Sequence, residues 1–345
     1  MSSMRLWEKV LTVAVAAVAL GIGAILIYTF AFDESHAKED PAANTGHERR
    51  IAHLQDELAE QRKRAAQAKP AKTASGLPPA SAGGNGTAGQ TSSASGRKLA
   101  DSFEQLAAEV PGTIGVAYAP LGSGTAEQLG DLESGHAWSS FKVPITIALM
   151  QSQGGSLTPE QESLATSAIA ASDNAAAASL FQDLEAATNG KASSTIEGML
   201  AQVDGGVTHV STAPPPSGAV SSWGQTEWPL TASTEFYGAL ACGEMGPADA
   251  VLSDMENVIP EQQWALGQAS FPAGTSVAYK AGWGPDGSES GPYLVRQAGI
   301  IRSGSRGAVV TIAAEDSSGS FDAGVADLNR VADWVAEHIP PNGMC

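Results

Sequence analysis

Ser139 and Lys142 are spaced so that they could act together as a nucleophile and its base. They begin and end the segment Ser139-Ser140-Phe141-Lys142, which has the form S-x-x-K. On a helix, positions i and i+3 share one face, so the hydroxyl of Ser139 can meet the amine of Lys142. A serine is a weak nucleophile until a neighbouring group takes its proton, and a desolvated lysine can be that neighbour.

Two later segments carry polar groups of the same kind. Ser172-Asp173-Asn174 opens an Ala-rich stretch, where it would also serve as an ordinary helix N-cap. Lys280-Ala281-Gly282 follows the strand-like Val277-Ala278-Tyr279 and could simply be a strand end. Even S-x-x-K is weak alone, since Ser95-Gly96-Arg97-Lys98 fits it by chance. Each segment by itself is therefore compatible with a structural role.

Together, the three segments resemble the signature of penicillin-recognising serine enzymes, which runs S-x-x-K, S-D-N, K-[ST]-G. Ser172 and Lys280 are 108 positions apart, close to the spacing in class A β-lactamases. The resemblance to these enzymes and to related D,D-peptidases covers roughly residues 99–340. It implies an α/β (α+β) fold of the β-lactamase/transpeptidase type, with an antiparallel sheet, flanking helices and a trimmed helical subdomain.

The resemblance also implies a role for each motif residue. Ser139 would form an acyl-enzyme, and Lys142 would accept or relay its proton. Ser172 would pass a proton to the leaving nitrogen. Asn174 would hold Lys142 and the substrate amide, while Lys280 would add positive charge beside the substrate carboxylate.

The substrate-binding residues implied by the resemblance are Ala281, Gly282, Trp283 and Arg296. The backbone N–H groups of Ser139 and Trp283 would form an oxyanion hole. Arg296 would be either a second contact for the substrate carboxylate or a solvent-facing strand residue, and both interpretations stay open. The expected ligands are a cell-wall peptide of the D-alanyl-D-alanine type or a β-lactam, and no cofactor is expected.

Three departures from the family pattern affect the expected activity. The loop at residues 208–218 has no carboxylate, whereas class A β-lactamases use a loop glutamate to activate the deacylating water. Glu227 follows this loop in the sequence, just before a predicted helix, where a negative charge is favoured by the helix dipole. Ala281 stands where the pattern has a hydroxyl. Ser139 and Ser172 are only 33 positions apart, so the helical subdomain must be shortened there.

Three functions therefore remain open. The first is an acyl-transfer enzyme that acts on wall peptides and is acylated by β-lactams. The second is a β-lactamase whose deacylating base is unidentified, with Glu227 or His209 as candidates. The third is a degenerate domain that only binds wall peptide or a partner. Retention of all five catalytic positions favours an enzyme.

Hydrophobic periodicity predicts the elements that would position these residues. A helix through Leu99, Phe103, Leu106 and Val110 is followed by a strand at 113–118 and a Gly-rich turn at 122–124. The stretch 139–241 is expected to be mostly helical. Strands are expected at 293–302 and 308–314, joined by a turn at 303–305. A closing helix has Val325, Leu328, Val331 and Val335 on one face.

Charge and composition exclude several classes of protein. The net charge is −18, and residues 99–345 alone carry −21, which disfavours binding to nucleic acid. Six histidines without an H-E-x-x-H pair and only two cysteines predict no metal site. We expect Cys242 and Cys345 to form a disulfide outside the cytoplasm, with two free thiols as the alternative.

The first 97 residues predict an anchor and a tether. Residues 10–32 carry no charge, and a helix of this length spans about 34 Å, enough for a bilayer core of about 30 Å. The basic flank places residues 1–9 in the cytoplasm, so the rest is expected outside. A cleaved signal peptide is the alternative. Residues 33–97 read as a stalk and a flexible Ala/Gly/Ser/Pro linker, and 98–345 as the hydrolase domain.

Overall fold

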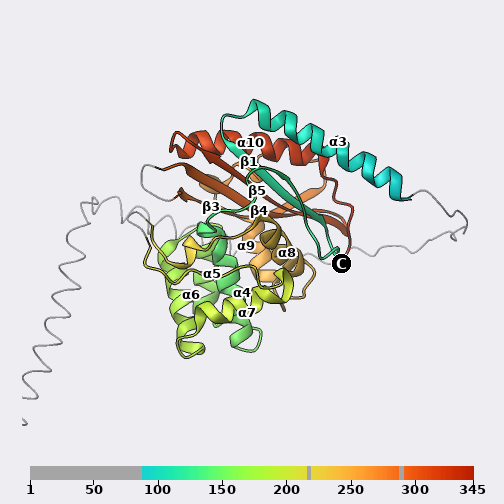
Figure 1. The fold of residues 1–345 in the computed structure, drawn as a ribbon. Helices are drawn as coiled ribbons and strands as arrows, with labels where there is room; N and C mark the ends of the chain where they lie inside the picture. Colours follow the sequence, from blue (N-terminus) through green and yellow to red (C-terminus); the bar gives the residue numbers. More distant parts are fainter. Residues whose placement is uncertain (1–87, 216–218, 287–290) are drawn as a thin grey trace, which may run out of the picture. The chain divides into compact units, whose positions relative to one another are not determined.

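Five antiparallel strands form one sheet in the described part of this computed structural model, which comprises residues 88–215, 219–286 and 291–345 (Figure 1). Their order across the sheet is β2-β1-β5-β4-β3. The strands are β1 (Thr113–Pro120), β2 (Glu127–Gly130), β3 (Thr275–Pro285), β4 (Tyr293–Ser303) and β5 (Arg306–Asp316). Strands from the start and the end of the domain thus lie side by side in one sheet, as predicted.

The register of the sheet places the candidate residues of β3 at an edge. β1 pairs with β5 along its whole length, from Thr113 opposite Glu315 to Pro120 opposite Ala308. β4 pairs with β5 on one side and with β3 on the other. Because β3 has β4 as its only neighbour among the described strands, its other side is open toward the helices.

Helices cover both faces of the sheet (Figure 1). α3 and α10 lie on one face, where the rings of Phe103 and Trp334 meet at 4.9 Å. α8 packs on the other face, next to the helical block that carries the first two motifs. The α-helices are α3 (Ala88–Glu109), α4 (Lys142–Ser152), α5 (Pro159–Ala170), α6 (Asn174–Ala187), α7 (Ala192–Asp204), α8 (Leu230–Ala241), α9 (Asp249–Glu256) and α10 (Phe321–His338).

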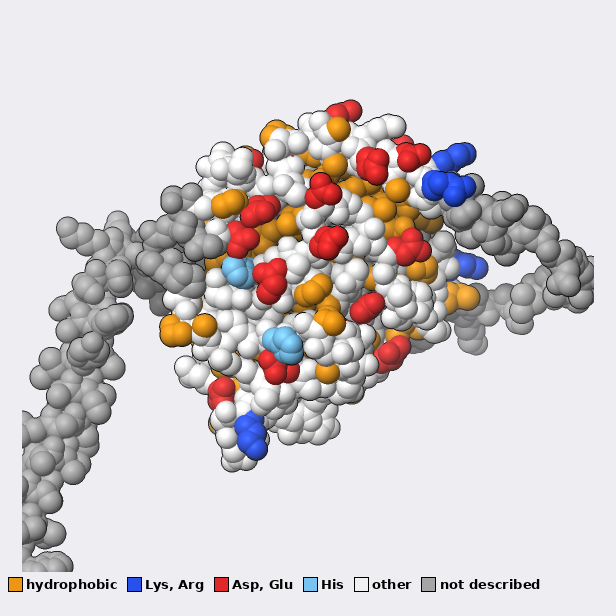
Figure 2. Space-filling model, viewed as in Figure 1, with side chains coloured by type: hydrophobic (Ala, Val, Ile, Leu, Met, Phe, Trp, Pro, Cys, Tyr) orange, Lys and Arg blue, Asp and Glu red, His pale blue; other side chains and the backbone are white. Residues whose placement is uncertain are grey.

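Acidic side chains are spread over the face of the domain drawn in Figure 2, whereas Lys and Arg lie at its margins. This distribution follows the sequence, in which residues 99–345 contain seven cations. A surface of this sign repels anionic partners at low salt and leaves neutral ones unaffected.

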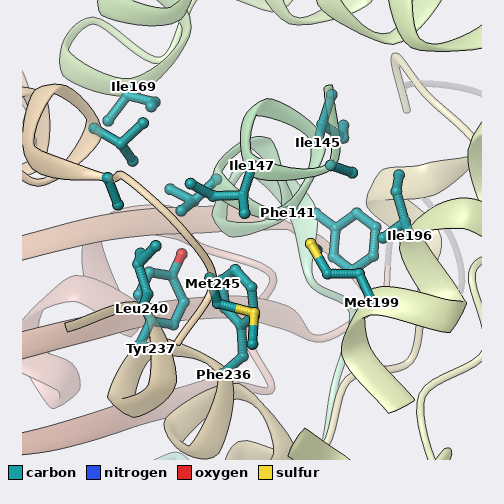
Figure 3. Close-up of a cluster of buried hydrophobic side chains, with 14 of the residues drawn as sticks. Phe141, Ile145, Ile147, Ile169, Ile196, Met199, Phe236, Tyr237, Leu240 and Met245 are labelled. Atoms are coloured by element: carbon teal, nitrogen blue, oxygen red, sulfur yellow. The ribbon is translucent and has the colours of Figure 1, made fainter. Parts of the chain in front are cut away.

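The helical block is held together by a large apolar cluster (Figure 3). Phe141, Ile145 and Ile147 are each no more than 1% exposed and contribute from the first motif and the helix that follows it. Side chains of α5, α7 and α8 surround them. α4 is buried on all sides from Lys142 to Met150, and most of these residues are apolar, which is typical of a helix inside a domain. The first motif is therefore fixed to a rigid, solvent-excluded support.

Most predicted elements agree with the structure, with one difference at the N-terminal helix. α3 begins at Ala88, inside the stretch predicted to be linker, because an Ala- and Ser-rich sequence without proline can extend a helix. The predicted anchor at 10–32 and stalk lie outside the described residues. Within the described ranges, no helix has the length and apolar character required to cross a bilayer.

A disulfide joins the end of α8 to the C-terminus, which confirms the predicted pairing. Cys242 and Cys345 are 103 positions apart in sequence. In the loop-entropy description, closing a loop of that length stabilises a protein by about 5 kcal/mol.

Removing this disulfide should therefore lower the melting temperature by roughly 10 °C, given a few degrees per kcal/mol for a domain of this size. The measurement is thermal unfolding with and without reductant. The double variant Cys242→Ser/Cys345→Ser is the control, because reductant should leave its melting temperature unchanged. An equal melting temperature for the wild type in both buffers would contradict the prediction.

Candidate active site

Ser139 lies on a tight 3₁₀ turn, η1 (Trp138–Phe141), that runs directly into α4. The backbone N–H of Lys142 donates to the carbonyl of Ser139, so the two residues occupy one helical turn, as the i, i+3 spacing predicts. Ser139 is half-buried, and Lys142 is 1% exposed. The turn thus presents a partly accessible hydroxyl above a buried amine.

The residue before Ser139 has a strained backbone. Trp138 has φ +47°, a left-handed conformation that is costly for a bulky side chain. Its indole lies against Gly284, where a Cβ would come within 2.2 Å of the ring. The surrounding packing therefore holds Trp138 in this conformation. Such strain costs on the order of 1–3 kcal/mol and often marks functional sites.

Gly282 brings β3 into direct contact with the turn that carries Ser139. A Cβ at this position would lie 2.5 Å from the carbonyl oxygen of Ala137 and 3.1 Å from the nitrogen of Ser139. Only a glycine allows two backbones to approach so closely. This contact fixes the third motif beside the first, although Ser139 and Lys280 are 141 positions apart in sequence.

Ser172 lies on the short link between α5 and α6 and has φ +59°. Asp173 is the N-cap of α6, and its carboxylate accepts the N–H of Ala176 at 2.9 Å, in agreement with the capping interpretation. The left-handed turn directs the carbonyl and the hydroxyl of Ser172 toward Lys142, since the amine donates to both.

The hydroxyl of Ser172 lies between two lysine amines. Lys280 Nζ donates to Ser172 Oγ at 2.9 Å, and Lys142 Nζ does so at 3.4 Å. Lys142 also donates to Asn174 Oδ1 at 2.8 Å, and Lys280 to the carbonyl of its neighbour Ala281 at 3.2 Å. The three motifs therefore meet in one hydrogen-bond network. The contacts of Lys142 with Asn174 and of Lys280 with Ser172 are those that the family resemblance implied. Helical spacing predicted a contact of Lys142 with Ser139, but among the described residues the Lys142 amine bonds to the Ser172 turn instead.

Burial changes the protonation of both amines. Desolvation lowers the pKa of Lys142 to about 7, while the charge of Asp173 opposes this shift. Desolvation, and then the charge of Lys142, hold the pKa of Lys280 well below its ordinary value. With a pKa of about 7, the Lys142 amine is therefore substantially neutral near pH 7. One neutral amine is therefore available as a proton acceptor.

The side chains of Ala281 and Trp283 point away from the motif network. Ala281 is 2% exposed and belongs to the apolar cluster on the α10 side of the sheet. The ring of Trp283 meets those of Trp264 at 6.0 Å and Phe321 at 5.6 Å in the same cluster. Only the main chain of these two residues is left to contact a ligand beside the motif network.

Arg296 occupies a position that neither sequence interpretation described. It lies on β4 opposite Gly282 and is 0% exposed, so the prediction of a solvent-facing residue is wrong. Its Nη1 donates to the carbonyls of Gly135 at 2.9 Å and Trp228 at 3.0 Å. The guanidinium also lies 5.5 Å from the ring centroid of Trp228. Arg296 thus binds the main chain that leads into the nucleophile turn, and this geometry does not support contact with a substrate carboxylate.

Glu227 is separated from the motif network. It is exposed, and its backbone forms a bridge with His136. Its charge acts on Arg296, His136 and Glu315, whereas Asp173 is the carboxylate whose charge acts on Lys142. The other candidate base, His209, is exposed on the loop that follows α7. Neither residue is in contact with the lysines in the described part of the chain.

Several residues of the site had no sequence signal. Trp138 and Gly284 form a packed pair, and Gly135 and Trp228 accept the hydrogen bonds of Arg296. In the sequence, Trp138 is visible only as a tryptophan directly before S-x-x-K, and Gly284 only as a second glycine two positions after Gly282. Neither pattern predicts a contact between the two residues.

Several solved structures have the same overall fold as this chain. The extended-spectrum β-lactamase TLA-1 superimposes with a TM-score of 0.55 over 70% of this chain and 98% of its own, at 15% identity. An ancestral class A β-lactamase (GNCA) gives 0.54 over 69% and 99%, at 20% identity. A class A β-lactamase from Bacteroides cellulosilyticus DSM 14838 gives 0.55 over 71% and 98%, at 13% identity.

The fold is that of a class A β-lactamase. The fold class predicted from the sequence is therefore confirmed. No protein-family model matches the chain, and no curated protein does. At identities of 13–20% the β-lactamase likeness concerns the fold, and the chemistry must be argued from the site itself.

Gly282→Ala should separate β3 from the nucleophile turn. The new Cβ would overlap backbone atoms that cannot rotate away, so we expect about 1–3 kcal/mol of destabilisation and a large loss of Ser139 reactivity. The measurements are thermal unfolding and the rate of labelling by a fluorescent penicillin.

Gly198→Ala is the matched control, since its Cβ would meet nothing within 4 Å inside α7. There we expect unchanged labelling and equal or slightly higher stability, because alanine favours a helix by about 1 kcal/mol over glycine. Wild-type labelling of the Gly282 variant would contradict the close approach.

Proposed function

We propose that this protein is a serine acyl-transfer hydrolase that forms an acyl-enzyme at Ser139. The proposed substrates are cell-wall peptides of the D-alanyl-D-alanine type, with β-lactams as acylating analogues. The observation that carries the proposal is the hydroxyl of Ser172 held between the amines of Lys142 and Lys280, beside the turn that presents Ser139. A structural cluster has no need for two buried lysines without a carboxylate ion pair.

In the proposed acylation, Ser139 Oγ attacks the carbonyl carbon and its proton passes to Lys142. A pKa of about 7 suits this task, because the amine is then substantially neutral at physiological pH. Asn174 Oδ1 orients the amine. The C–N bond then breaks, and the leaving nitrogen takes the proton of Ser172 Oγ, which lies within reach of both lysines for its own reprotonation.

Deacylation is proposed to be slow. Hydrolysis of the acyl ester needs a base that activates water, and neither Glu227 nor His209 contacts the motif network in the described residues. A persistent acyl-enzyme favours a peptidase that is inhibited by β-lactams over a rapid β-lactamase. We also propose that the apolar segment 10–32 anchors the chain in the cell membrane, with the catalytic domain outside.

Labelling with a fluorescent penicillin tests this function. The wild type should acquire one label that persists for many minutes, and Ser139→Ala should acquire none. Ser95→Ala is the matched control, because it removes the serine of the chance S-x-x-K pattern and should label normally. A label that disappears within seconds would support a β-lactamase instead, and an unlabelled wild type would refute the acyl-enzyme.

The pH dependence of acylation tests the role of Lys142. The amine must be neutral to accept a proton, so the acylation rate should rise about tenfold per pH unit below 7 and level off above it. The measurement is the second-order labelling rate between pH 5 and 9. Lys191→Ala, at an exposed lysine before α7, should leave the profile unchanged. A profile that is flat across pH 7 would contradict a lysine base.

A further inference from the structure

Arg302, Arg306, Arg330 and Lys191 are all placed away from the motif network. Arg302 donates to the carbonyl of Ala241, and Arg306 to that of Asn342. Arg330 forms an ion pair with Glu109 on α3, and Lys191 is exposed before α7. Of the seven cations in residues 99–345, this leaves Lys142, Lys280 and Arg296 near the cleft.

Arg296 is not free to bind a carboxylate in the cleft. Its Nη1 is shared by two main-chain carbonyls, at 2.9 and 3.0 Å. Its Nε and Nη2 have no partner among the described residues, but both atoms are shielded from solvent. To reach a ligand, the guanidinium would have to leave the ring of Trp228 and release the segment before Ser139. That movement would disturb the nucleophile itself.

The two lysines are already engaged. Each is 1% exposed, and their amines donate to Ser172, Asn174 and the carbonyl of Ala281. Because burial lowers the pKa of both amines, and the charge of Lys142 further lowers that of Lys280, the pair carries less positive charge than two exposed lysines. Ala281, directly after Lys280, supplies no hydroxyl that could bind a carboxylate, and it is buried in the apolar cluster on the α10 side of the sheet.

The carboxylates around the motif network create an electrostatic potential that disfavours a bound anion. Asp173 lies close enough to Lys142 for its charge to act on that amine. The charges of Asp286, Glu227 and Glu315 act on one another or on His136 beyond the end of β3. The whole domain is strongly acidic, and the face in Figure 2 carries many Asp and Glu side chains. A free carboxylate would therefore gain little on entering this site, whereas a neutral amide would not experience this electrostatic repulsion.

From these contacts we propose, on the basis of the function proposed above, that the enzyme acts on D-alanyl peptide bonds whose leaving residue has no free carboxylate. The substrate is then an internal or capped bond, such as a cross-link or an amidated terminus. Ser139 Oγ forms an ester with the D-alanyl carbonyl, the C–N bond breaks, and the amine leaves with a proton from Ser172. The carboxyl group of the leaving residue stays in its own amide bond.

Two matched probes test this specificity: a fluorescent penicillin with its free carboxylate, and the methyl ester of the same compound. We expect second-order labelling rates at Ser139 within about fivefold of each other. A free acid that reacts more than about thirtyfold faster would overturn the inference and leave the proposed function intact. Labelling by neither probe would overturn both.

Arg296→Lys provides a second measurement. If Arg296 only supports the nucleophile segment, the substitution should change both labelling rates by the same factor. A selective loss with the free acid would show that Arg296 binds the carboxylate and would overturn the inference. Arg306→Gln is the matched control and should leave both rates unchanged, because Arg306 contacts Asn342 near the C-terminus. Thermal unfolding verifies that each variant is folded.

Discussion

The site depends on the hydrogen bonds that two buried lysine amines make to the hydroxyl of Ser172. Lys142 comes from the helical block, and Lys280 comes from the edge strand of the sheet. Burying either amine alone would be costly, because a charged group loses its hydration in the interior. The shared hydroxyl, the Asn174 side chain and two carbonyls offset that cost, and the lowered pKa of both amines keeps the pair from being fully charged.

This arrangement requires the helical block and the sheet to pack closely, so that the backbone of β3 is in direct contact with the backbone of the Ser139 turn. Gly282 supplies the contact, since even a methyl group would force β3 away from the Ser139 turn. Trp138 and Ser172 take up left-handed conformations on either side of the network. Arg296 secures the chain before Ser139 through Gly135 and adds no carboxylate-binding group to the cleft. In the proposed function, the same packing that positions Ser139 also limits which substrates can be recognised.

The meeting of the three motifs was expected from the resemblance to penicillin-recognising enzymes, whereas spacing alone predicted only the local geometry within each motif. Ser139 and Lys142 share a helical turn by geometry, and Asp173 is an N-cap by residue type. The position of the Arg296 side chain could not be predicted in this way. It depends on the register of β4 with its neighbouring strands and on the carbonyls of Gly135 and Trp228 that accept its hydrogen bonds. Trp138 was missed for the same reason, as its conformation is set by packing against a strand 146 positions away. α3 extended further than expected because an Ala-rich linker and an Ala-rich helix have similar composition.

Direct titration of the lysine side chains tests the central claim most directly. Carbon-13 NMR of the lysine Cε groups, assigned with Lys142→Ala and Lys280→Ala, would follow each amine between pH 5 and 11. The account predicts that Lys142 titrates near pH 7, that Lys280 titrates well below its ordinary range, and that removing Lys142 raises the midpoint of Lys280, because the neighbouring charge no longer opposes its protonation. Two independent lysines that both titrate near 10.5 would contradict it, since amines that share one buried hydroxyl cannot behave as free side chains.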